Sequence, residues 1–200
     1  MAARTRVKIC SITNVDDAMM AVNAGADALG FIFCTSKRTI TPSLVRIIIG
    51  QLPSLVTTVG VFMNQTLDEV LDMTEKSGVD VVQLHGQEDP DYCRAIRKRV
   101  IKRIDIRPGT TAASLMKEMD RFQVSGFLLD PGAGQGRTFD WKIAAGIQRP
   151  CIVAGGLTPD NVGTVVAMLH PFGVDVSSGV EQFPGKKDAA KVKRFIQEVR

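Results

Sequence analysis

Eight short runs of apolar, mostly β-branched residues recur along the chain, and segments with helical spacing of apolar positions lie between them. Such runs are typical of buried strands, and they occupy residues 7–12, 28–33, 56–63, 81–85, 100–106, 126–130, 151–154 and 174–177. Strands that alternate with helices pair in parallel, and the helices then cover the sheet. The pattern predicts eight strand–helix units in one α/β domain over residues 1–200.

Eight such units favour a closed (β/α)8 barrel of the TIM type. The competing architecture is an open doubly wound sheet, whose glycine fingerprint lies in the first strand-to-helix turn. Here the glycine-rich turns follow the last two strands instead, at residues 155–156 and 177–179. We therefore expect a single (β/α)8 barrel.

Helix start signals fall where this alternation requires them. Asn14 precedes an acidic first turn, and the spacing of Thr66 and Glu69 fits a capping box. Thr41 and Thr158 each stand directly before a proline, as a capping hydroxyl does when proline takes the first helical position. These signals predict helices that begin directly after Asn14, Thr41, Thr66 and Thr158.

The composition is that of an ordinary globular protein, with 44% hydrophobic residues, 23% charged residues and a formal net charge of +4. A nucleic-acid-binding protein would show a concentrated basic stripe with aromatic residues for stacking. The densest basic run, 186–194, has helical spacing and is interpreted as the solvated face of a terminal helix. No apolar stretch approaches the ~20 residues of a membrane span. We therefore expect neither a nucleic acid nor a membrane as a partner.

The cysteines lie far apart in the sequence, and none belongs to a C-x-x-C pair. They are Cys10, Cys34, Cys93 and Cys151. The two histidines, His85 and His170, add no metal-ligand spacing, so the sequence predicts no metal site. Unpaired thiols without a recognisable signal peptide indicate a cytoplasmic protein.

Glycine-rich turns follow the seventh and eighth predicted strands, where barrels of this kind carry phosphate sites. Gly155 and Gly156 belong to the first of these turns, and Ser178 and Gly179 belong to the second. Glycine lets the backbone approach a ligand closely, and its N–H group can bind an anion. Glycine also simply makes turns, but two such turns in consecutive units favour a phosphorylated small molecule as the ligand.

Two titratable residues close strands at the edge where the active sites of barrels lie. Cys10 ends the first strand, and it is either an inert buried thiol or a thiolate base whose pKa has fallen toward neutrality. Asp130 ends the sixth strand after three apolar residues. Burial would raise the pKa of Asp130 and let it act as a general acid, while a helix cap or a rim ion pair is the competing interpretation.

Three further features follow strands. Arg38 comes after the second strand and can pair with a substrate carboxylate, or it is a solvated loop residue. His85 ends the fourth strand, where a lone histidine is more often a structural hydrogen-bonding group than a catalyst. The loop 131–138, with Arg137 near its end, can close over a ligand or can be a plain connection.

Taken together, these motifs resemble the phosphoribosylanthranilate isomerase family of tryptophan biosynthesis, and the likeness runs through almost the whole chain. In chain order, the motifs that carry it are Val7-Lys8-Ile9-Cys10, Ile12-Thr13, Gly25-Ala26-Asp27, Ser36-Lys37-Arg38, Val59-Gly60-Val61-Phe62 with Asn64, Val82-Gln83-Leu84-His85-Gly86, Leu129-Asp130, Thr138-Phe139-Asp140-Trp141, Ala154-Gly155-Gly156-Leu157, residues 174–179 and residues 181–188. No single motif decides the matter, but their order and spacing are specific as a set.

The resemblance implies a reaction and the two residues that carry it. The family catalyses the Amadori rearrangement of N-(5-phosphoribosyl)anthranilate to 1-(2-carboxyphenylamino)-1-deoxyribulose 5-phosphate, without a metal or a cofactor. The family's general base stands at the position of Cys10, and its general acid stands at the position of Asp130.

The resemblance also implies how the substrate is held. Arg38 would face the anthranilate carboxylate, Asp175 would bond to sugar hydroxyls, and His85 would lie near the aromatic ring. The phosphate would lie in the two glycine turns, against Gly155, Gly156, Ser178 and Gly179.

The chain departs from the family pattern in three places. Ser11 stands where the family usually has glycine, Arg137 stands where lysine is common, and the loop before Ser36 is one residue shorter. Two alternatives stay open beside the isomerase. One is a related barrel isomerase of histidine biosynthesis, a reaction usually run by two aspartates, and the other is a catalytically silent barrel that only binds phosphorylated metabolites. We expect a monomer or a homodimer.

Overall fold

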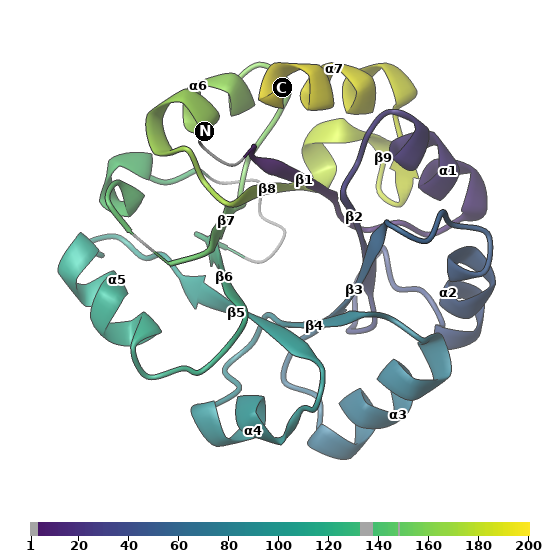
Figure 1. Cartoon of the computed structure of the whole chain (residues 1–200), viewed down its shortest axis with the longest axis horizontal. Helices are drawn as coiled ribbons and strands as arrows, with labels where there is room; N and C mark the ends of the chain where they lie inside the picture. The colour runs from purple at the N-terminus through teal and green to yellow at the C-terminus, as the bar shows by residue number, and fades with distance from the viewer. Residues whose placement is uncertain (1–3, 133–137, 148) are drawn as a thin grey trace.

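The computed structural model describes residues 4–132, 138–147 and 149–200, which form a closed barrel of eight parallel strands surrounded by helices (Figure 1). The strands are β1 (Arg6–Ile9), β2 (Ala28–Ile32), β3 (Thr57–Phe62), β4 (Val81–Leu84), β5 (Arg99–Asp105), β6 (Gly126–Asp130), β7 (Cys151–Val153) and β8 (Gly173–Val176). They pair in chain order, and β1 closes the barrel by pairing with β8. The predicted (β/α)8 barrel is confirmed.

Helices follow the strands on the outside of the barrel. They are α1 (Val15–Asn23), α2 (Pro42–Ile49), α3 (Leu67–Ser77), α4 (Pro90–Ala95), α5 (Ala112–Met119), α6 (Val162–Leu169) and α7 (Ala189–Val199). Between β6 and β7, the described residues form one 3-10 helix, η1 (Trp141–Ala144), instead of an α-helix. A second 3-10 helix, η2 (Ser178–Val180), follows β8 directly.

Three of the four predicted helix starts are confirmed by their caps. The side chains of Asn14, Thr41 and Thr66 each accept a hydrogen bond from a backbone N–H in the first helical turn, and Thr66 forms the predicted capping box with Glu69. The start predicted after Thr158 is wrong. The Thr158 hydroxyl instead accepts from the Asp160 N–H within a turn, and α6 begins three residues later than Pro159, at Val162.

Alternate side chains on each strand pack into two separate apolar layers. Outward-facing residues such as Ile9, Phe31 and Phe127 are fully buried against the helices. Burying one such side chain contributes about 1.5–3 kcal/mol, so this layer carries most of the stability. A smaller cluster around Leu128 and Ile152 fills the inside of the barrel. The barrel interior becomes polar toward the carboxyl ends of the strands, and that end is where the candidate site lies.

A small antiparallel hairpin interrupts the pattern between β8 and α7. It consists of β9 (Glu181–Phe183) and β10 (Lys186–Lys187). The interpretation of the basic run 186–194 as the solvated face of a helix is therefore wrong at its start. Lys187 is 2% exposed and pairs with Glu181, and α7 begins only at Ala189.

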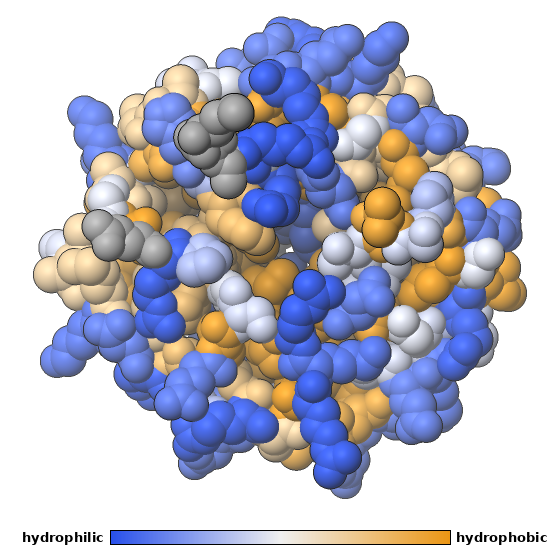
Figure 2. Space-filling model, viewed as in Figure 1, coloured by the Kyte–Doolittle hydropathy of each residue, from blue (hydrophilic) through white to orange (hydrophobic). Residues whose placement is uncertain are grey.

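Hydrophilic residues predominate around much of the rim of this face, with apolar residues between them and around the barrel axis (Figure 2). This distribution follows from helices that turn one face to the sheet and the other to solvent. Within the described ranges, no helix is long and apolar enough to cross a membrane.

Candidate active site

A thiol and an ion pair lie together inside the barrel where β1 ends. The Lys8 ammonium donates a hydrogen bond to Asp175 Oδ1 at 2.9 Å, and both side chains are less than a tenth exposed. Cys10 lies two residues beyond Lys8 and so points to the same side of the strand. Gly30 on the neighbouring β2 leaves the space for both groups, because a Cβ there would lie 2.7 Å from Cys10 Sγ and 2.9 Å from Lys8 Nζ.

The surroundings of Cys10 act on its pKa in opposite directions. Burial is the largest cause and raises the pKa of the thiol, while the Lys8 ammonium lowers it and the Asp175 carboxylate raises it again. The balance is a raised pKa, so the lowered value that the base hypothesis called for is not met. The physical reason is that this strand end is more completely buried than a barrel rim. Among the groups that lower the pKa of the thiol, the Lys8 ammonium has the largest effect.

Asp130 ends β6 with its side chain nine-tenths buried. Its Oδ1 accepts a hydrogen bond from the Gly132 N–H at 2.9 Å, and its Oδ2 lies 3.6 Å from His85 Nε2. Burial raises the pKa of Asp130, and the Gly132 hydrogen bond and the Arg103 charge offset only part of this effect. The raised pKa agrees with the prediction for a carboxyl group that can donate a proton.

His85 lies directly after β4, and its neighbours keep the imidazole neutral. Burial, with the Arg103 and Lys8 charges, lowers the pKa of His85 to about 3. The Gln83 Nε2 amide lies 3.2 Å from His85 Nδ1. Because an amide nitrogen donates, Nδ1 accepts, and the ring hydrogen is placed on Nε2, facing Asp130.

The sequence interpretation assigned no role to Lys8, Gln83 or Arg103, although all three line the site. The Arg103 Nη2 donates to Asp105 at 2.6 Å and to the Asp130 carbonyl oxygen at 3.3 Å. The Arg103 Nε and the Gln83 Oε1 are buried without a hydrogen-bond partner among the described residues. A signal for Lys8 and Arg103 was present, because a charge inside an apolar strand is costly to bury unless it has a partner or a task, and the same holds to a smaller extent for the Gln83 amide.

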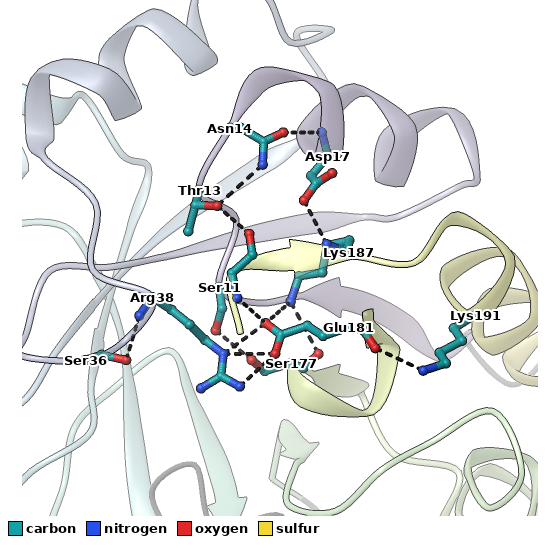
Figure 3. Close-up of polar contacts among 11 residues, drawn as sticks. Ser11, Thr13, Asn14, Asp17, Ser36, Arg38, Ser177, Glu181, Lys187 and Lys191 are labelled. Atoms are coloured by element: carbon teal, nitrogen blue, oxygen red, sulfur yellow. Dashed lines mark hydrogen bonds and ion pairs between the residues drawn. The ribbon is translucent and has the colours of Figure 1, made fainter. Parts of the chain in front are cut away.

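Arg38, predicted to bind a substrate carboxylate or to be a solvated loop residue, pairs with a carboxylate of the protein itself. It follows β2 in a loop where Thr39 accepts from the Ser36 N–H, and its guanidinium lies against Glu181 of the β9–β10 hairpin (Figure 3). The shortest contact, from Arg38 Nη2 to Glu181 Oε2, is 2.7 Å. The sequence interpretation gave no role to Glu181.

The two glycine turns lie against each other at the ends of β7 and β8. Gly155 and Gly156 adopt left-handed conformations, with φ of 86° and 61°, which glycine tolerates without strain. A Cβ at Gly179 would lie 1.9 Å from the Leu157 carbonyl oxygen. Glycine at position 179 is therefore what allows the two turns to touch.

These turns present unpaired backbone donors. Within the part of the chain that the structure describes, the N–H groups of Gly155, Gly156, Ser178 and Gly179 donate to no protein acceptor. Ser178 and Gly179 also form the first positions of η2, where backbone N–H groups have no partner inside the helix. Converging N–H groups of this kind can bind an anion such as a phosphate.

Ser11, where the family usually has glycine, is held in a left-handed conformation with φ of 65°. The Ser11 hydroxyl lies 2.6 Å from the Ser177 hydroxyl. Ser11 as a whole is 1% exposed. The backbone conformation explains why glycine suits this position, since a Cβ there costs about 1–2 kcal/mol. The hydrogen bond to Ser177 offsets part of that cost.

We expect Ser11→Ala to lower the free energy of unfolding by about 1–2 kcal/mol, because it removes the hydrogen bond and keeps the strain. Ser11→Gly should leave that free energy within about 1 kcal/mol of the wild type, because relief of strain and loss of the bond oppose each other. Urea denaturation of the two variants measures the difference. Equal destabilisation by both would show that the left-handed backbone costs nothing here.

In the proposed lid at 131–138, residues 133–137, including Arg137, lie outside the described residues. Among the residues that the structure does describe, no group of three or more His, Cys, Asp or Glu side chains gathers as a metal ligand set.

An eight-stranded barrel with buried titratable groups and two glycine turns at the carboxyl ends of its strands defines the class of (β/α)8 barrel enzymes. Within that class, the model of the N-(5'-phosphoribosyl)anthranilate (PRA) isomerase family matches residues 7–198. The chain belongs to this family.

Known members are similar over almost their whole length. The N-(5'-phosphoribosyl)anthranilate isomerase of Pelobacter propionicus is 48% identical over 200 residues, which are 96% of this chain and 94% of that protein. A crystal structure of phosphoribosyl anthranilate isomerase with reduced 1-(o-carboxyphenylamino)-1-deoxyribulose 5-phosphate is 40% identical, with a TM-score of 0.86 over 98% of each chain. A structure of monomers generated from the dimeric isomerase of Thermotoga maritima is 39% identical, with a TM-score of 0.86 over 98% of each chain.

The comparisons decide between the alternatives left open by the sequence. The family model and these three relatives all carry the anthranilate isomerase name. They favour neither an isomerase of histidine biosynthesis nor a catalytically silent barrel.

Proposed function

We propose that this chain, as one barrel domain over residues 1–200, converts N-(5-phosphoribosyl)anthranilate to 1-(2-carboxyphenylamino)-1-deoxyribulose 5-phosphate in tryptophan biosynthesis. The observation that carries the proposal is the pair Cys10 and Asp130, buried at the ends of β1 and β6 with the glycine turns of β7 and β8 between them in the barrel order. General acid and base catalysis by this pair needs no metal or cofactor.

Asp130 acts first, as the general acid. It gives its proton to the ring oxygen of the furanose, the bond from C1 to that oxygen breaks, and the nitrogen lone pair forms a C1=N double bond. The raised pKa of Asp130 supports this role, because burial keeps a larger share of the carboxyl protonated. The hydrogen on His85 Nε2 faces the carboxylate that remains.

Cys10 acts second, as the general base. The C1=N bond acidifies the hydrogen on C2, and the Cys10 thiolate removes it as a proton. The electron pair of the C2–H bond forms a C1=C2 double bond, and the nitrogen recovers its lone pair. The enol then becomes the ketone as C1 takes up a proton from solvent and the O–H group at C2 releases its proton to solvent. Asp130 takes up a proton and Cys10 releases one, which restores the starting state. Lys8 supports the thiolate because its ammonium is buried beside Asp175 and Cys10.

The remaining groups hold the substrate. Arg38 binds the anthranilate carboxylate, and the N–H groups of Gly155, Gly156, Ser178 and Gly179 bind the phosphate. Asp175 receives Lys8 on Oδ1, which leaves Oδ2 for a sugar hydroxyl. The neutral imidazole of His85 lies beside the anthranilate ring.

We expect the purified protein to consume N-(5-phosphoribosyl)anthranilate with a kcat of about 1–10³ s⁻¹, the usual range for enzymes. Loss of the substrate's fluorescence follows the reaction. A protein that turns over no substrate but still binds the reduced product analogue would contradict the proposal and favour the silent barrel.

The cellular setting is part of the same proposal. All four cysteines are free thiols, which supports a reducing compartment, the cytoplasm. We propose a monomer or a homodimer, and the mass of the particle in solution distinguishes the two.

A further inference from the structure

The Arg38 guanidinium meets Glu181 along one edge only. Arg38 Nε donates to both carboxylate oxygens, at 2.9 Å and 3.0 Å, and Nη2 donates to Oε2 at 2.7 Å. A guanidinium has five N–H groups in a planar fork. The Nε–Nη2 edge is therefore occupied. Among the residues that the structure describes, none accepts a hydrogen bond from Nη1, so the Nη1–Nη2 edge keeps donors for a second carboxylate.

Glu181 is fixed from its other side, so it does not depend on Arg38 for its place. Lys187 Nζ donates to Glu181 Oε1 at 3.0 Å, and the Gly185 N–H donates to the same oxygen at 3.3 Å. The Glu181 and Lys187 side chains are 3% and 0% exposed. Figure 3 shows the Glu181 carboxylate between Arg38 and Lys187.

The hairpin that carries Glu181 is itself anchored to the first strand–helix unit. The Lys187 N–H donates to Asp17 Oδ2 at 2.8 Å, and the Thr13 hydroxyl donates to the Gly185 carbonyl oxygen at 2.6 Å. Asp17 is buried at the start of α1. Glu181 therefore connects Arg38, on a loop after β2, to a rigid part of the barrel.

The cluster has an unbalanced positive charge. Arg38 and Lys187 carry two positive charges, and Glu181 supplies one negative charge between them. Burial alone would raise the pKa of Glu181, but the hydrogen bonds from Arg38 and Lys187 outweigh burial and hold the pKa below its usual range. Asp17, the next carboxylate, pairs with the Lys186 ammonium. One further carboxylate on the open edge of Arg38 would bring the summed charge of Arg38, Lys187 and Glu181 to zero.

We propose that Glu181 is a positioning residue that aims the Nη1–Nη2 edge of Arg38 at the carboxylate on the substrate's aromatic ring, and that Glu181 thereby sets the preference for a carboxylated substrate. The inference rests on the role proposed above for Arg38. Glu181 stays in place during binding, because Lys187 and Gly185 continue to hold it. It does not compete with the substrate, because the two carboxylates use different edges of one guanidinium.

Glu181→Gln tests this inference, since the amide keeps the shape but presents an NH2 group to the Arg38 donors. Two substrates are compared: N-(5-phosphoribosyl)anthranilate and N-(5-phosphoribosyl)aniline, which lacks the carboxylate. We expect the KM for the anthranilate compound to rise about tenfold with kcat within about threefold, and kcat/KM for the aniline compound to stay unchanged. The preference for the carboxylated substrate should therefore fall about tenfold.

Two further variants make the outcomes distinguishable. Arg38→Met should abolish the preference, and Lys186→Gln should leave it unchanged, because Lys186 belongs to the same hairpin but contacts Asp17 instead of Glu181. If Arg38→Met loses the preference but Glu181→Gln keeps it in full, the positioning role of Glu181 is overturned and the role of Arg38 stands. Full preference in Arg38→Met would overturn the role of Arg38 as well.

Two other results would also overturn the inference. A lower KM for the anthranilate compound in Glu181→Gln would mean that Glu181 competes with the substrate for Arg38. An equal loss on both substrates would mean that Glu181 only supports the local structure.

Discussion

Cys10→Ala lowers kcat on N-(5-phosphoribosyl)anthranilate by about 10²–10⁴-fold, and Asp130→Asn has an effect of similar size, because each variant removes one proton transfer. Both side chains are buried. The change from Asp to Asn is nearly isosteric and the change from Cys to Ala removes one heavy atom, so we expect the barrel to fold in both variants. The fluorescence assay measures kcat, and circular dichroism checks the fold. Full activity in Cys10→Ala would remove the proposed base.

Cys34→Ala is the matched control for the thiol. Cys34 is a free, half-buried cysteine just beyond the end of β2, on the same face of the barrel as Cys10. Cys34 takes no part in the proposed proton transfers although it lies near Cys10, so we expect kcat to stay within about twofold of the wild type.

The pH dependence separates the two roles. Catalysis needs a protonated Asp130 and an ionised Cys10, although burial raises the pKa of both groups. The pKa of the thiol lies above that of the carboxyl group. At pH values between the two, the fraction of thiolate rises with pH as fast as the fraction of protonated Asp130 falls, so the rate stays level. The rate decreases at pH values below the Asp130 pKa and at pH values above the Cys10 pKa.

Asp130→Asn should remove the lower inflection from this profile. Its residual activity should rise with pH until the thiol is fully ionised, since only the base then titrates. Rates of wild type and variant across the acid and alkaline range give the comparison. A wild-type kcat that stays flat over the whole range would argue against the acid–base pair.

The strand pattern was predictable because each strand is an apolar run whose outer face packs on a helix. The strand ends therefore marked Cys10, Asp130 and the glycine turns. Lys8 could also be placed, since residues two apart on a strand share a face and Lys8 must point inward with Cys10. Its partner Asp175 follows from closure of the barrel, which sets β8 beside β1 in a register that pairs Lys8 with Asp175.

The contact between Arg38 and Glu181 could not be predicted in this way. The two residues are 143 positions apart, and they meet only because a short hairpin folds back after β8. The same hairpin explains the wrong interpretation of Lys187, since helical spacing in a basic run cannot reveal a strand of two residues. The helix start predicted after Thr158 was wrong for a related reason. The Thr158 hydroxyl caps a turn, and the helix does not continue from that turn.

We expect Gly179→Ala to lower both stability and substrate binding, because the two glycine turns touch at Gly179 and leave no room for a side chain. The added Cβ would lie 1.9 Å from the Leu157 carbonyl oxygen and 3.0 Å from its carbonyl carbon. Both are backbone atoms that cannot rotate away, so η2 must move off the turn that holds Gly155 and Gly156. Overpacking of this kind costs about 1–3 kcal/mol of stability.

The displacement should weaken substrate binding more than it weakens folding. If the N–H groups of both turns bind one phosphate, moving them apart removes several charge-assisted hydrogen bonds at once, and we expect KM to rise by at least about tenfold. Gly163→Ala in α6 is the control, since a Cβ there meets Glu198 at an ordinary 3.5 Å. Thermal unfolding and KM for both variants make the comparison. A Gly179→Ala protein with reduced stability but an unchanged KM would show that the phosphate does not depend on the contact between the two turns.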